Sequence, residues 1–365
     1  MSIVIFIVIL LVLVLVHEFG HFWTAKKFDI RVDEFGFGFP PKVFGYKKGE
    51  TEYSFNLLPI GGFVKIFGEN PDDENTFGPD KERSFINKAR WKQAIVLFAG
   101  VFANFLLAFV LLSFNFVSGM PTSVGSGVTD YPLKDVKLMV VAVMPDSPAE
   151  KAGIMPSDNL VSLKSGQDFV DTLNPDVLKS FVVSHPKKEI EVGFTRGESA
   201  EINYLKVTPT VRDNKEPVIG ISMDQVGIAK LPFFRAAWEG FQLTIFVTKE
   251  TAVGLFNLLK EAIMGRGSLT YVTGPVGMVG IVGEAYDLGI SYILSFAAII
   301  SINLAIINLI PFPALDGGRL FFLLIEKIKG SRLNPKFTNV ANVIGFAILI
   351  LFMIVVTYHD IYNLF

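Results

Sequence analysis

Two histidines and a glutamate stand close together near the start of the chain, in the order His17-Glu18-Phe19-Gly20-His21. On a helix, this His-Glu-x-x-His spacing places both imidazoles one turn apart on one face and keeps the carboxylate beside them. Imidazoles bind zinc, and a neighbouring carboxylate can take a proton from water and pass it to a leaving amine. The spacing therefore predicts metal-assisted peptide hydrolysis, with His17 and His21 as zinc ligands and Glu18 as general base.

A catalytic zinc ion takes three protein ligands and keeps a fourth position open, so a third ligand is required. The chain contains no cysteine, which leaves histidine and carboxylate as the available ligand types. Asp316 is the expected third ligand, because it and Arg319 are the only charged residues from Ile290 to Ile325. The alternative is Glu34, which follows His21 in the chain but lies in a polar stretch.

The composition places the chain among membrane proteins. Of its 365 residues, 51% are hydrophobic and 35 are phenylalanine, which is too apolar for the surface of a soluble protein. The net charge is only −2, and no block of basic residues indicates a nucleic acid partner. We therefore expect the lipid bilayer as a partner of the chain, and no nucleic acid.

Four stretches have the length and apolar character of a helix that crosses the bilayer. The first carries the His-Glu-x-x-His motif, and its apolar run needs residues 17–23 to complete the crossing. A cleaved signal peptide is the competing interpretation, but the stretch has no basic start and no small-residue cleavage site. The four expected spans are 3–23, 94–117, 291–312 and 338–358.

Lysine and arginine residues flank these spans in the loops 24–93 and 326–337. Because basic loops remain in the cytoplasm, both termini and the region 118–290 are expected outside it. The segment 233–264 is apolar but carries several charged residues, and a fifth crossing there would separate Asp316 from the histidines. We expect amphipathic helices there instead, lying on the outer surface or packed on the bundle.

Between the first two spans, Val32–Phe39 and Glu52–Lys65 have strand-like patterns, and Gly61-Gly62 is the expected hairpin turn. This pattern predicts a small membrane-associated β-sheet beside the site. Because a helix hides its carbonyl groups, a protease needs an extended substrate, which a sheet edge can bind by strand addition. The alternative is a hairpin that only closes the cytoplasmic opening.

Proline residues interrupt the third span just before Asp316. Pro311 and Pro313 break a helix and free backbone groups, which at membrane depth are tolerated where they line a cavity or meet a ligand. A broken helix beside a metal ion suits a substrate cleft. For Asn308, shortly before the first proline, the alternative to a role at the site is a hydrogen bond between helices.

From about residue 125 to 210 the pattern becomes that of a soluble α/β module. The change in pattern indicates a separate folded domain outside the membrane. Its expected elements are a strand at 137–143, a short helix within 145–153, a strand near Leu160, a helix at 175–184, and strands at 189–194 and 201–207.

These motifs together resemble the site-2 protease family, and within it the bacterial regulator of sigma-E proteases. Residues 143–154 also resemble PDZ domains of bacterial membrane proteases. The sigma-E enzymes usually carry two tandem PDZ domains, whereas this chain has room for one. The likeness covers nearly the whole chain and includes His17-Glu18-x-x-His21, Leu58-Pro-Ile-Gly-Gly-Phe-Val-Lys65, Gly274-Pro275 and Asn308-x-x-Pro311-x-Pro313-x-Leu315-Asp316-Gly317.

The resemblance implies a zinc metalloendopeptidase with Asp316 as a ligand, which cleaves single-span membrane proteins in regulated intramembrane proteolysis. Its substrates would be pre-trimmed anti-sigma factors or signal-peptide remnants, and an upstream site-1 protease would act first. The PDZ domain would admit substrates whose outer domain has been removed. In the family, the asparagine that matches Asn308 contacts substrate, and we assign Pro311, Pro313 and Gly61-Gly62 to the same substrate-binding region.

The expected fold is an α-helical polytopic membrane protein with four transmembrane helices, a membrane-associated β-hairpin and one extracytoplasmic PDZ-like α/β domain. It would lie in a bacterial inner membrane with both termini outside the cytoplasm. Its expected parts are an N-terminal membrane part at 1–119, the PDZ-like domain at 120–215, amphipathic helices and a linker at 216–289, and a C-terminal membrane part at 290–365.

Two other functions use similar residues. A membrane zinc or cation transporter also carries histidine and aspartate, but transporters commonly show internal repeats and polar groups on several helices. The spans 94–117 and 338–358 contain no charged residue, which disfavours transport. An inactive protease-like scaffold would keep the fold, but it would have no use for Glu18.

Overall fold

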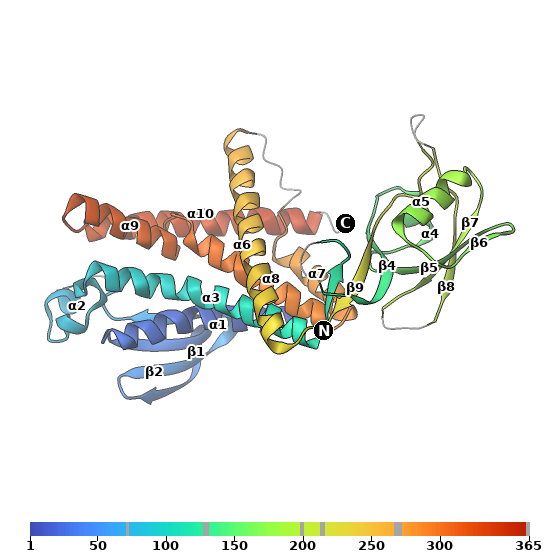
Figure 1. Ribbon diagram of the computed structural model, residues 1–365. Helices are drawn as coiled ribbons and strands as arrows, with labels where there is room; N and C mark the ends of the chain where they lie inside the picture. The colour runs from blue at the N-terminus through green and yellow to red at the C-terminus, as the bar shows by residue number, and fades with distance from the viewer. Residues whose placement is uncertain (71–72, 127–130, 198–200, 212–215, 266–271, 363–365) are drawn as a thin grey trace. The chain divides into compact units, whose positions relative to one another are not determined.

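A computed structural model describes residues 1–70, 73–126, 131–197, 201–211, 216–265 and 272–362 (Figure 1). The chain divides into two compact units, each with its own buried core. The first unit comprises Met1–Leu112, Gly240–Ala285 and Ile293–Phe365, and the second comprises Ser113–Glu239 and Tyr286–Tyr292.

Four helices among the described residues are long and apolar enough to cross a membrane, and they coincide with the four stretches expected to span it. The third ends at Leu309 rather than at residue 312, because Pro311 lacks the N–H that would continue the helix. The predicted break at Pro311 and Pro313 is therefore confirmed. The four helices are α1 (Ser2–Lys27), α3 (Arg90–Ser118), α8 (Ile290–Leu309) and α10 (Pro335–Tyr362).

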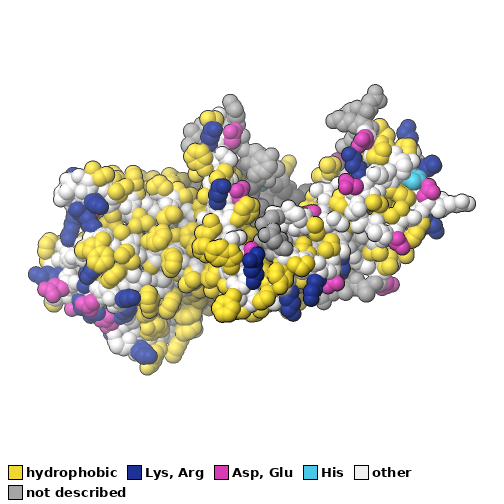
Figure 2. All heavy atoms as spheres, viewed as in Figure 1, with side chains coloured by type: hydrophobic (Ala, Val, Ile, Leu, Met, Phe, Trp, Pro, Cys, Tyr) yellow, Lys and Arg dark blue, Asp and Glu magenta, His cyan; other side chains and the backbone are white. Residues whose placement is uncertain are grey.

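Apolar side chains cover much of the visible face of the helices in the first unit, as Figure 2 shows. Many basic and acidic side chains of this unit gather at the end where the short helix α2 (Asp73–Phe77) lies. On α10, large apolar side chains such as Ile344, Phe346 and Leu351 are exposed. A continuous apolar surface of this kind suits lipid rather than water.

The chain between α1 and α3 forms a hairpin of two long strands, β1 (Val32–Lys48) and β2 (Thr51–Ile66). Its turn lies at Gly49 and Glu50, so the turn predicted at Gly61-Gly62 is wrong. Two short 3-10 helices, η1 (Lys81–Arg83) and η2 (Phe85–Asn87), then lead to α3.

Gly62 lies inside β2, where glycine serves close packing. A Cβ atom there would lie 2.9 Å from the carbonyl oxygen of Gly36 and 3.1 Å from Cδ2 of Leu15 on α1. The strand therefore passes against α1 at a point with little room for a side chain. The turn prediction failed because a Gly-Gly pair can indicate either a turn or a place where two backbone segments pack closely.

The long strands bend so that residues 34–37 of β1 are paired on both sides, with 62–65 of β2 on one side and with 52–55 on the other. Among the described residues, 62–65 have pairing partners on one side alone. This segment is therefore an edge of the sheet. An edge offers unpaired backbone N–H and C=O groups to another extended chain.

The hairpin turn is anchored by charge-assisted hydrogen bonds. Arg83 donates from Nη1 and Nη2 to the two carboxylate oxygens of Glu50 at 2.5 and 2.8 Å, and Lys26 of α1 donates to the same carboxylate. These donors, the Arg83 guanidinium first, lower the pKa of Glu50 to about 2. The contact ties the turn of the hairpin to the end of α1 and to η1.

The segment expected to be amphipathic forms one unbroken helix, α6 (Phe233–Ile263). By length and composition it is not among the four candidate spans of the described residues. Within the first unit, Phe241 of α6 packs edge-on against Phe109 of α3, with 6.4 Å between the ring centres.

α7 (Pro275–Asp287) begins beside the end of α10. The carboxylate of Asp360 accepts hydrogen bonds from the backbone N–H groups of Gly274 and Gly277, at 3.0 and 2.8 Å. A Cβ atom on Gly274 would lie 2.7 Å from this carboxylate. The Gly274-Pro275 motif is therefore a helix start that is capped by a side chain from another helix.

The second unit is built on a seven-stranded sheet in the order β3-β9-β4-β5-β7-β8, with β6 paired to β5. Two helices, α4 (Pro148–Ala152) and α5 (Pro175–Ser184), accompany the sheet, and Leu163, Leu178 and Ile190 belong to the common core. The strands are β3 (Met120–Ser123), β4 (Lys134–Val143), β5 (Asn159–Ser165), β6 (Asp168–Val170), β7 (Ile190–Thr195), β8 (Asn203–Val207) and β9 (Ile221–Ala229).

Strands β4, β5, β7 and β8 and helices α4 and α5 lie where the sequence pattern predicts them. The expected domain boundary at residue 215 falls outside the described residues. β9 begins after it, at Ile221, and pairs with both β3 and β4. The sheet therefore continues into the region that was expected to hold only a linker and amphipathic helices.

α1 and α3 approach each other closely at Gly20, where a Cβ atom would lie 2.4 Å from the carbonyl oxygen of Ala99. We predict that Gly20→Ala lowers the thermal unfolding temperature of the purified protein in detergent, because separating the helices costs about 1–3 kcal/mol. Gly254→Ala is the matched control, since nothing lies within 4 Å of its Cβ position on α6. Equal unfolding temperatures for the two variants would contradict close packing at Gly20.

Glu50→Gln is expected to destabilise the protein near neutral pH and to have little effect near pH 2. The pKa of Glu50 falls from 4.5 to about 2 on folding. Its stabilisation is therefore complete above the unfolded value and disappears as the pH falls through the folded value. The difference in unfolding temperature between the variant and the wild type should shrink as the pH falls from about 5 to about 2. A difference that does not change with pH would refute this role.

Candidate metal centre

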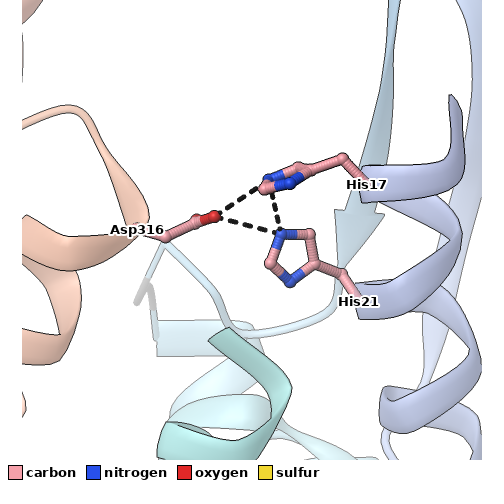
Figure 3. A group of neighbouring side chains, drawn as sticks. All are labelled: His17, His21 and Asp316. Carbon is pink, nitrogen blue, oxygen red and sulfur yellow. Dashed lines mark hydrogen bonds and ion pairs between the residues drawn. The ribbon is translucent and has the colours of Figure 1, made fainter. Parts of the chain in front are cut away.

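Three donor atoms converge in the first unit, two from α1 and one from the first residue of α9 (Asp316–Lys329) (Figure 3). His17 Nε2 lies 3.0 Å from Asp316 Oδ2, and His21 Nε2 lies 3.2 Å from the same oxygen. The two nitrogens are 3.2 Å apart. Both imidazoles are buried and the aspartate is partly buried. Residues 299 positions apart in the chain therefore share one small group.

The helical spacing of His17 and His21 brings their rings together, with centres 4.8 Å apart. Gly100 of α3 leaves the space that the rings occupy. A Cβ atom on Gly100 would lie 2.3 Å from Nε2 of His21 and 2.9 Å from Cε1 of His17. The two imidazoles thus fit between α1 and α3 only because this position of α3 has no side chain.

The bend between α8 and α9 determines where Asp316 lies. After Pro311 and Pro313, Ala314 adopts a left-handed backbone with φ of 75°. The N–H of Ala314 donates to Oδ1 of Asn342 on α10 at 3.2 Å, so a side chain replaces the lost helical hydrogen bond. The chain then starts a new helix with Asp316 in its first turn, where a negative charge is favoured.

The two glycines after Asp316 allow this bend to lie directly against α9. A Cβ atom on Gly317 would lie 2.3 Å from the carbonyl oxygen of Ile310, and one on Gly318 would lie 2.2 Å from that of Phe312. Any other residue would push the bend away from the helix. The Asp-Gly-Gly sequence therefore holds the carboxylate in place through backbone packing.

The ring of His21 is oriented by a hydrogen bond on the side away from Asp316. Its Nδ1 donates to the carbonyl oxygen of Val96 on α3 at 2.8 Å. When Nδ1 carries the proton, Nε2 presents a free lone pair. This is the arrangement in which an imidazole binds a metal ion through Nε2.

The donor set fits zinc. Bonds of about 2.0–2.2 Å at tetrahedral angles place two zinc ligands roughly 3.3 Å apart. The three separations here are 3.0, 3.2 and 3.2 Å. Two imidazoles and one carboxylate leave a fourth position open, as in catalytic rather than structural zinc sites.

A cavity of about 340 Å³ lies beside the donor atoms and is lined by Glu18. The backbone of Val64 forms a hydrogen bond with the Glu18 carboxylate. Phe63 and Val64, from the edge segment of β2, and the neighbouring Ile66 line the same cavity. The cavity therefore brings the carboxylate, the three donors and the edge of the sheet together.

Some of the other residues singled out in the sequence line this cavity, and others lie next to it or away from it. Asn308, at the end of α8, lines it. Pro311 and Pro313 form the bend, and Gly61-Gly62 directly precede the lining residues of β2. Glu34, the alternative third ligand, is not part of the donor group and instead accepts a hydrogen bond from Ser54 in the hairpin.

Three polar residues of the cavity wall were not assigned from the sequence, namely Glu69, Asn104 and Arg319. Arg319 of α9 forms an ion pair with Glu69, which follows β2. Arg319 stands three residues after Asp316, a spacing that shares a helix face. Asn104 is an amide in an apolar stretch of α3, where polar groups tend to be functional. Both signals were present in the sequence.

Comparison with known proteins identifies the family of the chain. The model of Peptidase family M50 matches residues 5–352. The chain is 31% identical to zinc metalloprotease RasP of Shouchella clausii, over 99% of this chain and 98% of the relative. It is 29% identical to regulator of sigma-W protease RasP of Bacillus subtilis, over 100% of this chain and 99% of the relative.

These relatives and the His-His-Asp group both indicate zinc, and the four apolar helices indicate a multi-pass membrane protein. They favour proteolysis over the transport that the sequence left open as an alternative. The family match spans both the histidine motif and Asp316. The chain therefore belongs to peptidase family M50, the site-2 protease family, and is an intramembrane zinc protease.

Proposed function

We propose that His17, His21 and Asp316 hold the zinc ion and that Glu18 is the general base. The observation that carries this proposal is the convergence of two imidazole nitrogens and one carboxylate oxygen, at separations of 3.0 to 3.2 Å. Ionisable groups inside an apolar helix bundle are costly, and a bound metal ion offsets that cost. The position of Glu18 in the same cavity supports its role.

Different residues around the cavity serve different steps of hydrolysis. When bound, zinc acts as a Lewis acid that polarises a carbonyl group and makes water acidic enough to lose a proton near neutral pH. Glu18 accepts the proton of the attacking water and delivers it to the leaving amine. The hydrogen bond from Val64 holds the Glu18 carboxylate beside the sheet edge. We assign Asn308 to binding the substrate backbone.

Glu18→Gln is expected to retain zinc, while its cleavage rate falls about 10²–10⁴-fold, because glutamine keeps the shape of the side chain but accepts no proton. His21→Ala and Asp316→Ala are expected to lose zinc as well, because each removes one of three ligands. Zinc content of the purified variants and cleavage of a transmembrane reporter in liposomes measure the two effects. Wild-type turnover by Glu18→Gln would remove Glu18 from the mechanism.

We further propose that the substrate binds as an extended strand along residues 62–66 of β2. A transmembrane helix hides its carbonyl groups, so it must unwind before it can be cut. Residues 62–65 are paired on one side alone, and Phe63, Val64 and Ile66 line the cavity that holds Glu18. Gly61-Gly62 at the start of this segment and the bend at Pro311 and Pro313 would leave room for the substrate backbone.

Disulfide cross-linking tests this binding mode, because the chain has no cysteine of its own. In a Glu18→Gln background, Phe63→Cys is expected to cross-link to a substrate that carries one cysteine near the cleaved bond. Val43→Cys is the control, since Val43 is an exposed residue of the same hairpin outside the cavity wall. Equal cross-linking from both positions would argue instead for a hairpin that only closes the cytoplasmic opening.

We also propose the arrangement in the membrane that the basic loops indicate, with both termini and the second unit outside the cytoplasm. The second unit combines an antiparallel sheet with the helices α4 and α5, which supports a single PDZ-like domain that screens substrates. The relatives are bacterial, and we propose that the chain lies in the inner (cytoplasmic) membrane of a bacterium.

The substrate class that we propose is a single-span membrane protein that an upstream site-1 protease has already trimmed. One relative is named regulator of sigma-W protease, which supports an anti-sigma factor as substrate, beside signal-peptide remnants. Capture by the Glu18→Gln variant, followed by identification of the bound membrane proteins, would reveal the natural substrates.

A further inference from the structure

Asn104 is a fully buried amide on α3, with an exposed fraction of 0%. Its side-chain oxygen Oδ1 has no hydrogen-bond partner among the described residues, whereas its Nδ2 lies 3.4 Å from Nδ1 of His17. Its backbone oxygen accepts a hydrogen bond from Oγ of Ser301 on α8 at 2.9 Å. A buried amide oxygen without a partner is unfavourable, so this orientation of the amide needs an explanation.

In this orientation the amide presents its Nδ2 group to Nδ1 of His17. When His17 binds a metal ion through Nε2, its Nδ1 carries the proton and is a donor. The Nδ2 group of Asn104 is also a donor, so two donors would face each other. Oxygen and nitrogen of an amide have nearly the same shape, and their assignment follows from the hydrogen-bond network. Rotation of the amide by half a turn exchanges the two atoms.

We propose that Oδ1 of Asn104 accepts the Nδ1–H of His17 and thereby directs Nε2 of this histidine toward the zinc ion. This arrangement gives the buried oxygen its partner and removes the clash of donors. Asn104 is then a positioning residue, which acts on the metal only through His17. The inference rests on the proposed role of His17 as a zinc ligand.

The same face of α3 orients both imidazoles. Val96, Gly100 and Asn104 stand four residues apart and therefore share one side of the helix. The carbonyl oxygen of Val96 accepts from Nδ1 of His21, and Asn104 accepts from Nδ1 of His17 in the rotated form. Gly100, between them, leaves the space for the rings. One helix thus supplies the outer hydrogen-bond partners of two ligands from another helix.

Zinc affinity tests the inference independently of cleavage. The full chain is purified in detergent, stripped of metal and titrated with zinc in competition with a chromophoric chelator. Asn104→Leu keeps the size of the side chain but offers no acceptor, and it is expected to weaken zinc binding about 10- to 100-fold. Asn104→Asp keeps an acceptor oxygen, and it is expected to bind zinc at least as tightly as the wild type.

Asn115→Leu is the matched control, because Asn115 is also a fully buried amide of α3 but is hydrogen-bonded to Ser291. It is expected to lower the unfolding temperature of the metal-free protein and to leave zinc affinity unchanged. If leucine at position 104 prevents folding, Asn104→Ala replaces it in the comparison with Asn104→Asp.

Two results would overturn the inference while zinc binding by the wild type remains intact. One is unchanged zinc affinity in Asn104→Leu, and the other is a loss in Asn104→Asp as large as that in Asn104→Leu. Failure of the wild type itself to bind zinc would overturn the proposed ligands, and the role of Asn104 with them.

Discussion

The close contact between α1 and α3 is the constraint on which the metal centre depends. Both imidazoles lie between these helices, and they fit because Gly100 carries no side chain, while Gly20 lets the two helices approach each other. The same contact places the carbonyl oxygen of Val96 against one ring and the amide of Asn104 against the other. Rings confined in this way keep their donor atoms in position before a metal ion arrives, so little reorganisation is needed when it binds.

The second requirement is a carboxylate at the same depth, and a broken helix meets it. The bend after α8 would expose backbone groups that lipid cannot satisfy. The side chain of Asn342 accepts a hydrogen bond from one of these N–H groups, that of Ala314. Gly317 and Gly318 let the remaining backbone of the bend lie against α9. The bend also borders the cavity that contains Glu18. The irregular backbone, the polar cavity and the three metal-binding atoms therefore lie together. Peptide hydrolysis inside a bilayer needs this combination, because water and metal ligands require a polar environment there.

Features with local signals could be predicted from the sequence. The histidine motif occupies five consecutive residues, the spans are long apolar runs, and the helix break follows from two prolines, so each depends on neighbours in the chain. The turn at Gly61-Gly62 was predicted wrongly, because glycine is used there for contact with Leu15 and not for a turn. β9 was missed as part of the sheet because its partners, β3 and β4, lie far before it in the chain.

Residue chemistry and helical periodicity alone therefore indicated the proposed ligand types, the proposed general base and the number of long apolar helices. The sequence favoured Asp316 over Glu34 as the third ligand, but only the fold shows that Asp316 lies 3.0 Å from His17. The roles open to Asn104 and Val64 likewise appeared only with the fold. These contacts join segments that are distant in the chain, and such contacts depend on how helices and strands pack rather than on any local pattern.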